Sequence, residues 1–336
     1  MCEAVTITHP CSKQAMAFIV AVALSCSLLL FASGQPADAG AAVRQAAAQA
    51  SDARPKAQGD SPADGSATPG ADEPSTDLSR ARVYLFRGAL GLIFSRGMDK
   101  LAARIQRTGV TVNVYEFTLC GLIASTAIEE YKRDPFPIIL MGHSMGGRCA
   151  LEFSEKLKDE GIPVGLVVTI DPAHLSPSVP TNVARFINIF LSRDMLGGGD
   201  IKPVAGFPGH YASYDLQEHG ELHINIDKME AIHQQLAAKI LDVAAAPAKS
   251  EGETLPLRYV VPAKADVELW DSGIAIAARS GDTLQSLAAQ YRLPLWALTQ
   301  LNQPSDNMPL VAGQRIVIPR HLPAPAVVPE PVSSKR

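Results

Sequence analysis

Apolar runs of strand length alternate with helical patterns from residue 81 to residue 245. The strand-like runs are short and almost continuously apolar, and they cover residues 81–87, 110–117, 136–142, 165–171, 184–192 and 210–217. The segments between them place apolar side chains at helical spacing, and two of them end at a glycine, Gly109 or Gly161. A last helix is expected from Asp227 to Val243, with Asp227 as its N-cap and Glu230 completing a capping box. This alternation predicts a sheet of about six mainly parallel strands with helices on both faces.

The N-terminal segment has the pattern of an export signal. An almost unbroken apolar run covers residues 15–32, Lys13 precedes it, and the A-x-A pattern Ala37-Asp38-Ala39 follows it. We therefore expect residues 1–39 to be a signal peptide that is cleaved, with an uncleaved N-terminal anchor or a misread start as the alternatives. Residues 40–80 are rich in Ala, Pro, Gly and Ser, which predicts a disordered linker. The protein is expected in the periplasm or cell envelope, or else anchored in the inner membrane or secreted.

Charge and cysteine content narrow the function classes. The chain has 30 Lys and Arg against 34 Asp and Glu, a net charge of -4, so nucleic-acid binding is not expected. Five cysteines without a CxxC pattern or a Cys/His cluster predict neither a zinc site nor a disulfide scaffold. Cys120 and Cys149 lie in the folded part and are interpreted as two small buried apolar side chains, with a disulfide as the alternative if the protein is exported.

One short motif carries a clear chemical prediction. The sequence Gly142-His143-Ser144-Met145-Gly146-Gly147 matches the pattern G-x-S-x-G. It follows the most apolar strand and opens a long amphipathic helix, which is the strand–turn–helix setting of a nucleophile elbow. Glycines beside such a serine let the strand and the helix approach closely, and the helix N terminus directs free N–H groups at the serine. We therefore expect Ser144 to be a nucleophile, with His143 as a structural neighbour rather than a base.

A serine hydroxyl needs an adjacent base, and the chain supplies an acid and a histidine after Ser144 in the order Ser–Asp–His. Asp171 ends the strand GLVVTI, and His223 lies in the loop between the last strand and the final helix. Parallel strands direct their carboxyl ends to one edge of the sheet, so the three side chains can converge there. His219 lies in the same loop and is the alternative base.

With this arrangement, residues 81–245 resemble a small α/β-hydrolase of the serine esterase and lipase kind. The segment Thr169–Ala173 is similar to that of lipases whose triad acid follows the strand after the nucleophile; in most of the family the acid follows one strand later, where Asp194 would qualify. The resemblance implies an oxyanion hole formed by the backbone N–H of Met145 and that of Ala89 or Leu90. The first two strands of the family's sheet are missing and there is no room for a large cap domain, so an open site is expected.

Residues 273–320 resemble a LysM domain, a small βααβ module. The resemblance rests on Ser280-Gly281-Asp282-Thr283-Leu284, Ser286-Leu287-Ala288, Leu298-Thr299-Gln300-Leu301-Asn302 and Gly313–Pro319. It implies binding of peptidoglycan or another N-acetylglucosamine-containing glycan, with Gly281, Asp282, Thr283, Leu284 and Asn302 as contact residues. Asp282 and Gln285 are expected to form a capping box. Residues 246–272 are interpreted as a linker and residues 321–336 as a Pro-rich tail.

Together these features predict an exported serine hydrolase that a LysM module tethers to cell-wall glycan. Ser144 attacks an acyl carbonyl, His223 serves as general base and then as general acid, and Asp171 orients His223. The substrate is expected to be an ester or thioester of a small molecule or a lipid, and the reaction needs no metal or organic cofactor. Two alternatives remain: a catalytically inactive hydrolase fold that acts as a peptidoglycan-binding scaffold, and a wall-modifying O-acetyl esterase or amidase.

Overall fold

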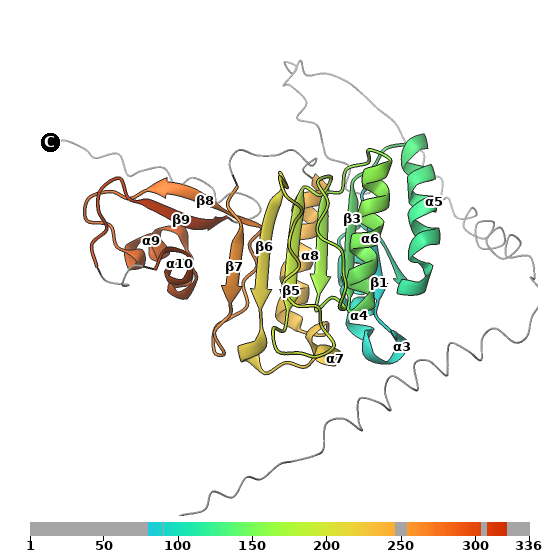
Figure 1. The fold of residues 1–336 in the computed structure, drawn as a ribbon, viewed down its shortest axis with the longest axis horizontal. Coiled ribbons are helices and arrows are strands. Elements are labelled where there is room, and N and C mark those ends of the chain that lie inside the picture. Colours follow the sequence, from blue (N-terminus) through green and yellow to red (C-terminus); the bar gives the residue numbers. More distant parts are fainter. Residues whose placement is uncertain (1–79, 90, 246–253, 304–307, 321–336) are drawn as a thin grey trace, which may run out of the picture. The chain divides into compact units, whose positions relative to one another are not determined.

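A computed structural model describes residues 80–89, 91–245, 254–303 and 308–320 of the chain (Figure 1). The expected signal peptide, almost all of the expected linker at 40–80 and the tail from residue 321 lie outside the described residues. Among the described residues, no helix combines the length and the apolar character needed to cross a lipid bilayer.

The described strands of the larger domain form one parallel sheet in the order β2-β1-β3-β4-β5-β6-β7. They are β1 (Arg82–Arg87), β2 (Thr111–Glu116), β3 (Ile138–His143), β4 (Leu166–Ile170), β5 (Arg185–Phe190), β6 (His210–Asp215) and β7 (Leu257–Val260). The first six coincide with the predicted apolar runs, and β3 extends one residue beyond its run, to His143. Strands β3 to β6 are buried along their whole length, because helices cover both faces of the sheet, and this explains why most of them read as nearly continuous apolar runs.

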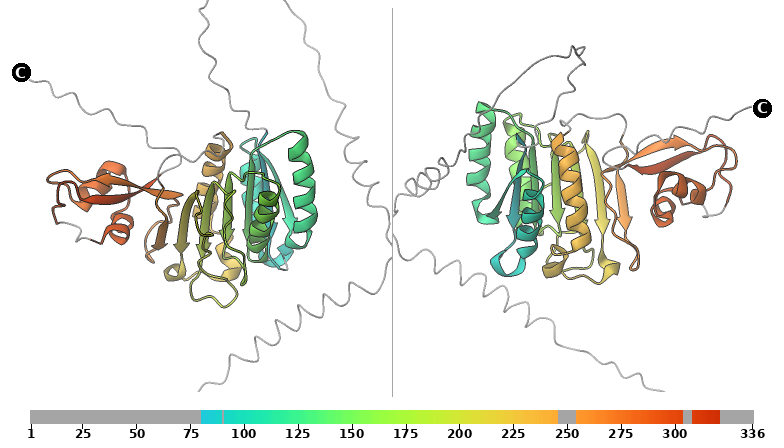
Figure 2. Two further views of the ribbon diagram at one scale, coloured as in Figure 1. Left: turned by 45° about the horizontal axis from the view of Figure 1, so that its top comes forward. Right: turned by 180° about the vertical axis from the view of Figure 1, so that it is seen from behind.

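Two pairs of helices cover the two faces. Helices α4 (Arg96–Gln106) and α8 (Glu230–Ala245) lie on one face, and α5 (Cys120–Arg133) and α6 (Met145–Asp159) lie on the other (Figure 2). Each face has its own cluster of buried apolar side chains. Short helices, including α3 (Gly91–Phe94) and α7 (His223–Ile226), follow β1 and β6 at the carboxyl edge of the sheet. The predicted α/β arrangement is confirmed.

Asp227 does not serve the expected capping box. Helix α8 begins at Glu230, and the Oδ2 atom of Asp227 instead accepts a hydrogen bond of 2.9 Å from the backbone N–H of Gly97. Gly97 lies in the first turn of α4, so the carboxylate satisfies a free amide of a neighbouring helix rather than of its own. The helix expected from Asp227 to Val243 therefore begins three residues later, at Glu230, and Asp227 follows the short helix α7.

The C-terminal module has the expected βααβ order. It consists of β8 (Ser272–Ala277), α9 (Leu284–Tyr291), α10 (Leu295–Asn302) and β9 (Arg315–Arg320), with β8 and β9 antiparallel. The capping box at the start of α9 is formed by Thr283 and Ser286, not by Asp282 and Gln285. The side chain of Asp282 instead stabilises the turn before α9, where its Oδ2 atom accepts a hydrogen bond of 2.7 Å from the backbone N–H of Arg279.

The segment interpreted as a linker contributes to the core that joins the module to the sheet. Residues 257–260 form β7 at the edge of the sheet, and the side-chain amide of Gln300 in α10 exchanges two hydrogen bonds with the backbone of Val260, at 3.1 and 2.7 Å. Trp270 is fully buried and its ring packs near those of Tyr259 and Trp296. The sheet and the module therefore share one apolar cluster.

Replacing Trp270 with alanine is expected to lower the free energy of unfolding by about 3–5 kcal/mol, because a fully buried ring is removed from a cluster that cannot refill the space. Chemical denaturation measures this loss. The matched control is Leu222→Ala, which removes a large apolar side chain that is 57% exposed and should change stability by less than about 0.5 kcal/mol. A loss below about 1 kcal/mol for Trp270→Ala would contradict the shared core.

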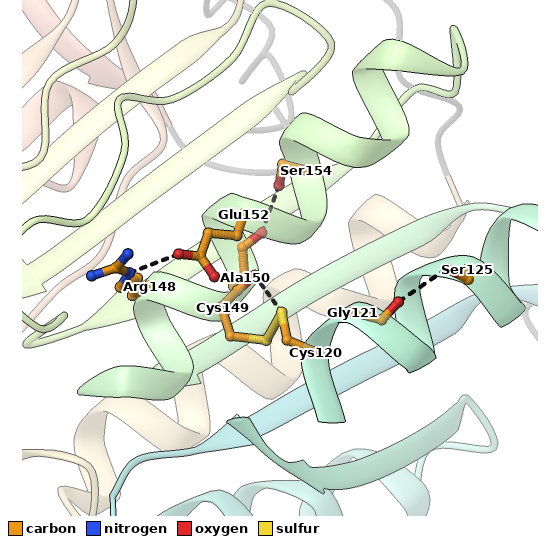
Figure 3. The surroundings of a disulfide bond; sticks show 8 residues. All are labelled: Cys120, Gly121, Ser125, Arg148, Cys149, Ala150, Glu152 and Ser154. Atoms are coloured by element: carbon orange, nitrogen blue, oxygen red, sulfur yellow. Dashed lines mark hydrogen bonds and ion pairs between the residues drawn. A yellow bond between two sulfur atoms is a disulfide. The ribbon is translucent and has the colours of Figure 1, made fainter. Parts of the chain in front are cut away.

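A disulfide joins two helices on one face of the sheet. Cys120 begins α5 and Cys149 lies in the second turn of α6, with 5.7 Å between their Cα atoms (Figure 3). The interpretation of these cysteines as two free buried side chains is therefore wrong. Spacing along the chain gave no distance between the helices, and it is the packing of α5 on α6 that brings the sulfur atoms together.

Candidate active site

Ser144 occupies a strained turn between β3 and α6. Its φ of 56° and ψ of -123° place a residue with a side chain in a conformation that such residues rarely adopt. The turn is very tight: a Cβ atom on Gly146 would lie 2.1 Å from the carbonyl oxygen of Phe86 in β1. Only a glycine allows α6 to start so close to the sheet, and the result is the geometry of a nucleophile elbow.

Asp171 and His223 meet at the carboxyl edge of the sheet. Asp171 follows β4, is fully buried, and has its Oδ2 atom 2.7 Å from Nδ1 of His223. Its Oδ1 atom accepts the backbone N–H of Leu191 at 3.2 Å, so both carboxylate oxygens are engaged. The ionised acid can only accept, so Nδ1 of His223 carries the proton and Nε2 is left as the basic nitrogen. The structure thus brings together the two residues that the sequence predicts to be the acid and the base.

Asp194, the alternative acid, also lies close to this pair. One carboxylate oxygen of Asp194 falls within 4.8 Å of ligand atoms of both Asp171 and His223. Its Oδ1 atom accepts the backbone N–H of Leu196 at 2.7 Å and so shapes its own loop. Nδ1 of His223 donates its hydrogen bond to Asp171 and makes no described hydrogen bond to Asp194, which favours Asp171 as the orienting acid.

His219, the alternative base, has a different environment. It ends the short helix η3 (Gln217–His219), and its Nε2 atom is buried without a hydrogen-bond partner among the described residues. The described contacts of the acid involve His223, not His219. The geometry therefore favours His223 as the base.

A glycine-rich loop passes directly over the acid. A Cβ atom on Gly197 would lie 2.1 Å from Oδ1 of Asp171, so this position requires the absence of a side chain. The loop is tied to the segment after β4 by a hydrogen bond of 2.9 Å between His174 and the carbonyl of Met195. Together these contacts cover the buried carboxylate.

The expected oxyanion hole lies at the start of α6 and after β1. Met145 is the first residue of α6, so its N–H is at the positive end of that helix. Ala89 is exposed in the turn after β1, and Leu90 lies outside the described residues. Arg87, just before this turn, binds Asp99 and Glu116; hydrogen bonding to Asp99 contributes most to raising the pKa of its guanidinium. These ion pairs hold the start of this loop in place.

Two buried residues adjoin this site without having been predicted as part of it. The Nδ1 atom of His143 lies 2.8 Å from Oγ of Ser95, and its Nε2 atom lies 2.9 Å from the carbonyl oxygen of His223. His143 was expected to be a structural neighbour, and Ser95 had no distinguishing sequence signal. Serine is a common residue, and only the fold brings positions 95 and 143 together.

Large apolar side chains are exposed on the segments around the site. They follow β1, β4, β5 and β6 at the carboxyl edge, and they are Ile93, Leu175, Met195, Leu196, Leu222 and Ile224. We call these residues the apolar rim. Leu222 and Ile224 flank His223 directly, and Leu175 is 87% exposed. Other exposed apolar side chains lie elsewhere, but this edge carries several on neighbouring segments, which makes it a candidate surface for binding apolar material.

A separate cavity lies away from the candidate catalytic residues. It has a volume of about 490 Å³ and is lined by residues of β1, β2, α5 and the segment after α5, among them Tyr84, Tyr115 and Phe136. None of the catalytic candidates lines it.

The expected glycan residues lie just before and at the start of α9, and at the end of α10. The backbone carbonyl of Asp282 accepts the N–H of Leu310 at 2.7 Å, which joins the loop at 281–284 to the segment after α10. Leu284 is buried, and the side chain of Thr283 caps α9. The side chain of Asn302 is bound to the backbone of Val317 by two hydrogen bonds, so it ties α10 to β9.

Comparison with family models agrees with both parts of the fold. Residues 118–185, from the start of α5 through β3, the Ser144 elbow and Asp171, match the model described as a thioesterase domain. Residues 278–319 match the model of the LysM domain. The chain therefore combines a segment that is similar to thioesterase domains of the α/β-hydrolase class with a segment that is similar to LysM domains.

Solved structures of similar fold are distant from this chain. Human thioesterase 2 is 13% identical, covers 50% of this chain and 99% of its own length, and has a TM-score of 0.35. A putative hydrolase of the α/β superfamily from Xanthomonas campestris is 15% identical, covers 48% and 95%, and has a TM-score of 0.30. No curated protein matches the sequence. Likeness at this level gives no information about the substrate.

Proposed function

We propose that this protein is an exported serine hydrolase that cleaves acyl thioesters or esters and is held at N-acetylglucosamine-containing glycan by its LysM domain. The observation that carries the proposal is the pairing of Asp171 with Nδ1 of His223 beside the strained serine elbow. The thioesterase match over the elbow supports the same class of reaction.

The reaction would proceed by acyl transfer through Ser144. His223 takes the proton from the hydroxyl of Ser144 at its Nε2 atom as the oxygen attacks the acyl carbonyl. The N–H of Met145 and a second amide in the loop after β1 stabilise the oxyanion, and Asp171 stabilises the protonated His223. His223 then protonates the departing thiolate or alkoxide. A water molecule, deprotonated by His223, releases the acid and restores Ser144.

The apolar rim supports a substrate with an extended acyl chain. Burying each methylene group of such a chain against apolar side chains contributes about 0.8 kcal/mol. The residues of the rim are between 37% and 87% exposed, which supports an open edge rather than a closed tunnel. An open apolar edge can hold acyl chains of different lengths.

The disulfide between Cys120 and Cys149 supports export. Disulfides form and persist in oxidising compartments such as the periplasm and the extracellular space, and they are rare in the cytosol. This agrees with the apolar run and A-x-A pattern at the N terminus.

Hydrolysis of a graded substrate series tests the proposal. With acyl-coenzyme A thioesters and p-nitrophenyl esters of two to twelve acyl carbons, kcat/KM should rise by up to about fourfold per added methylene. Ile224→Ser should flatten this rise without abolishing hydrolysis of the acetyl substrate. Absence of hydrolysis across the series would contradict the proposal, and acetate release from purified peptidoglycan alone would favour a wall-modifying esterase.

Sedimentation with insoluble peptidoglycan tests the role of the LysM domain. The protein should co-sediment, and soluble chito-oligosaccharide should release it. Retention in the supernatant would contradict the proposed tether while leaving the hydrolase proposal intact.

A further inference from the structure

Three hydrogen bonds connect the loop after β1 to His223, the candidate base. The backbone N–H of Gly88 donates to Oγ of Ser95 at 3.0 Å, Ser95 lies 2.8 Å from Nδ1 of His143, and Nε2 of His143 lies 2.9 Å from the carbonyl oxygen of His223. Ser95 and His143 are each only 1% exposed. Both side chains are therefore shielded from bulk solvent.

We call this series of hydrogen bonds, from Gly88 through Ser95 and His143 to His223, the relay. The chemistry of each partner fixes which group donates in every one of these hydrogen bonds. The carbonyl of His223 can only accept, so the proton of His143 is on Nε2. Nδ1 of the neutral ring must then accept from the hydroxyl of Ser95, which leaves a lone pair of Oγ for the N–H of Gly88. Each group in the relay has one role, and none is left without a partner.

Burial keeps His143 in this neutral state. Removal of the ring from water, together with the charge that His223 can carry nearby, lowers the pKa of His143 to about 3. A protonated ring would place a proton on Nδ1 and break the bond from Ser95.

The two ends of the relay contact the candidate nucleophile Ser144 and the candidate base His223. Gly88 lies against the nucleophile, since a Cβ atom on it would be 2.7 Å from Cβ of Ser144, and it immediately precedes Ala89. At the other end, the bonded carbonyl belongs to His223 itself. His143, in the middle, is the residue before Ser144 in the elbow.

We propose that His143 and Ser95 are positioning residues that hold the oxyanion-hole loop and the base in register around Ser144. This inference rests on the proposed function and extends it to two residues that do not touch the substrate. Loss of the relay should displace the oxyanion donors and His223 without removing either. The consequence should be weaker binding of the tetrahedral transition state, with little change in substrate binding.

A second serine–histidine pair in the same chain provides a matched control. Oγ of Ser272 lies 2.8 Å from Nδ1 of His210, both residues are buried, and burial contributes most to lowering the pKa of His210 to about 3. This pair lies between β6 and β8 and makes no described hydrogen bond to Ser144, Asp171 or His223. Ser272→Ala removes the same kind of hydroxyl as Ser95→Ala without disturbing the relay.

The test compares Ser95→Ala with Ser272→Ala for thioester hydrolysis and for inhibition by an alkyl boronic acid, which forms a tetrahedral adduct with a catalytic serine. Ser95→Ala is expected to lower kcat by about 10- to 100-fold, with KM within about twofold, because small misplacement of catalytic groups is costly. Affinity for the boronic acid should fall by a similar factor. Ser272→Ala should change each value by less than about threefold, while thermal unfolding shows both variants folded.

His143→Gln provides a second variant if Ser95→Ala does not fold. Glutamine retains a donor that can reach the carbonyl of His223, but its amide oxygen does not occupy the position of Nδ1 and holds Ser95 less well, so kcat and boronic-acid affinity should again fall together. Folded relay variants with wild-type kcat and boronic-acid affinity would overturn this inference alone. A folded wild type that neither hydrolyses the substrates nor binds the boronic acid would overturn the proposed function as well.

Discussion

Replacing His223 with alanine is expected to lower kcat/KM by about five to six orders of magnitude. Removal of the base from a serine triad costs as much as removal of the whole triad, because the serine is then no longer activated. His223 is the histidine whose Nδ1 atom meets the buried acid, so its replacement should leave only the background rate. Steady-state hydrolysis of an acyl thioester measures the loss.

The matched control for His223→Ala is His219→Ala, four residues earlier in the same segment. His219 makes no described contact with Asp171, so its replacement should reduce kcat/KM by less than about tenfold. A large loss of kcat/KM in His219→Ala, with a small loss in His223→Ala, would show that His219 is the base in the active enzyme.

Replacing Asp171 with asparagine is expected to lower kcat by about 10⁴-fold, with KM little changed. Asparagine nearly retains the shape of the side chain, but its amide favours the wrong tautomer of the histidine and does not stabilise the imidazolium. The fully buried position of Asp171 leaves no water to take over that role. The loss should persist at high substrate concentration, since the change affects the chemical step.

Asp194→Asn is the control for Asp171→Asn. Its carboxylate lies within 4.8 Å of the pair and its Oδ1 atom binds the amide of Leu196, so a loss of less than about tenfold is expected. A larger loss in Asp194→Asn than in Asp171→Asn would assign the role of triad acid to the segment after β5.

The catalytic candidates could be predicted because each has a local sequence signal, and because the parallel sheet brings the three positions to the same edge. The glycines around Ser144 are needed for a tight strand-to-helix turn, and that requirement is visible in a few consecutive residues. Asp171 follows one parallel strand and His223 follows another, so convergence at the carboxyl edge follows from the sheet itself.

Interactions between distant segments could not be predicted in the same way. Asp227 binds an amide 130 positions away, and Ser95 reaches His143 across 48 positions. The residues 257–260 are too short a run to distinguish a strand from a linker, and they form β7 because β6 and α10 flank them. In each case the partner, not the local pattern, determines the structure.

Labelling with a fluorophosphonate probe tests the central claim most directly. The folded wild-type protein should form a covalent adduct, and mass spectrometry of its peptides should place the phosphonyl group on Ser144. Ser144→Ala and His223→Ala should not be labelled, whereas His219→Ala should be labelled as the wild type is. An absence of label on folded wild-type protein, or a label on another serine, would contradict the account of Ser144 as the nucleophile.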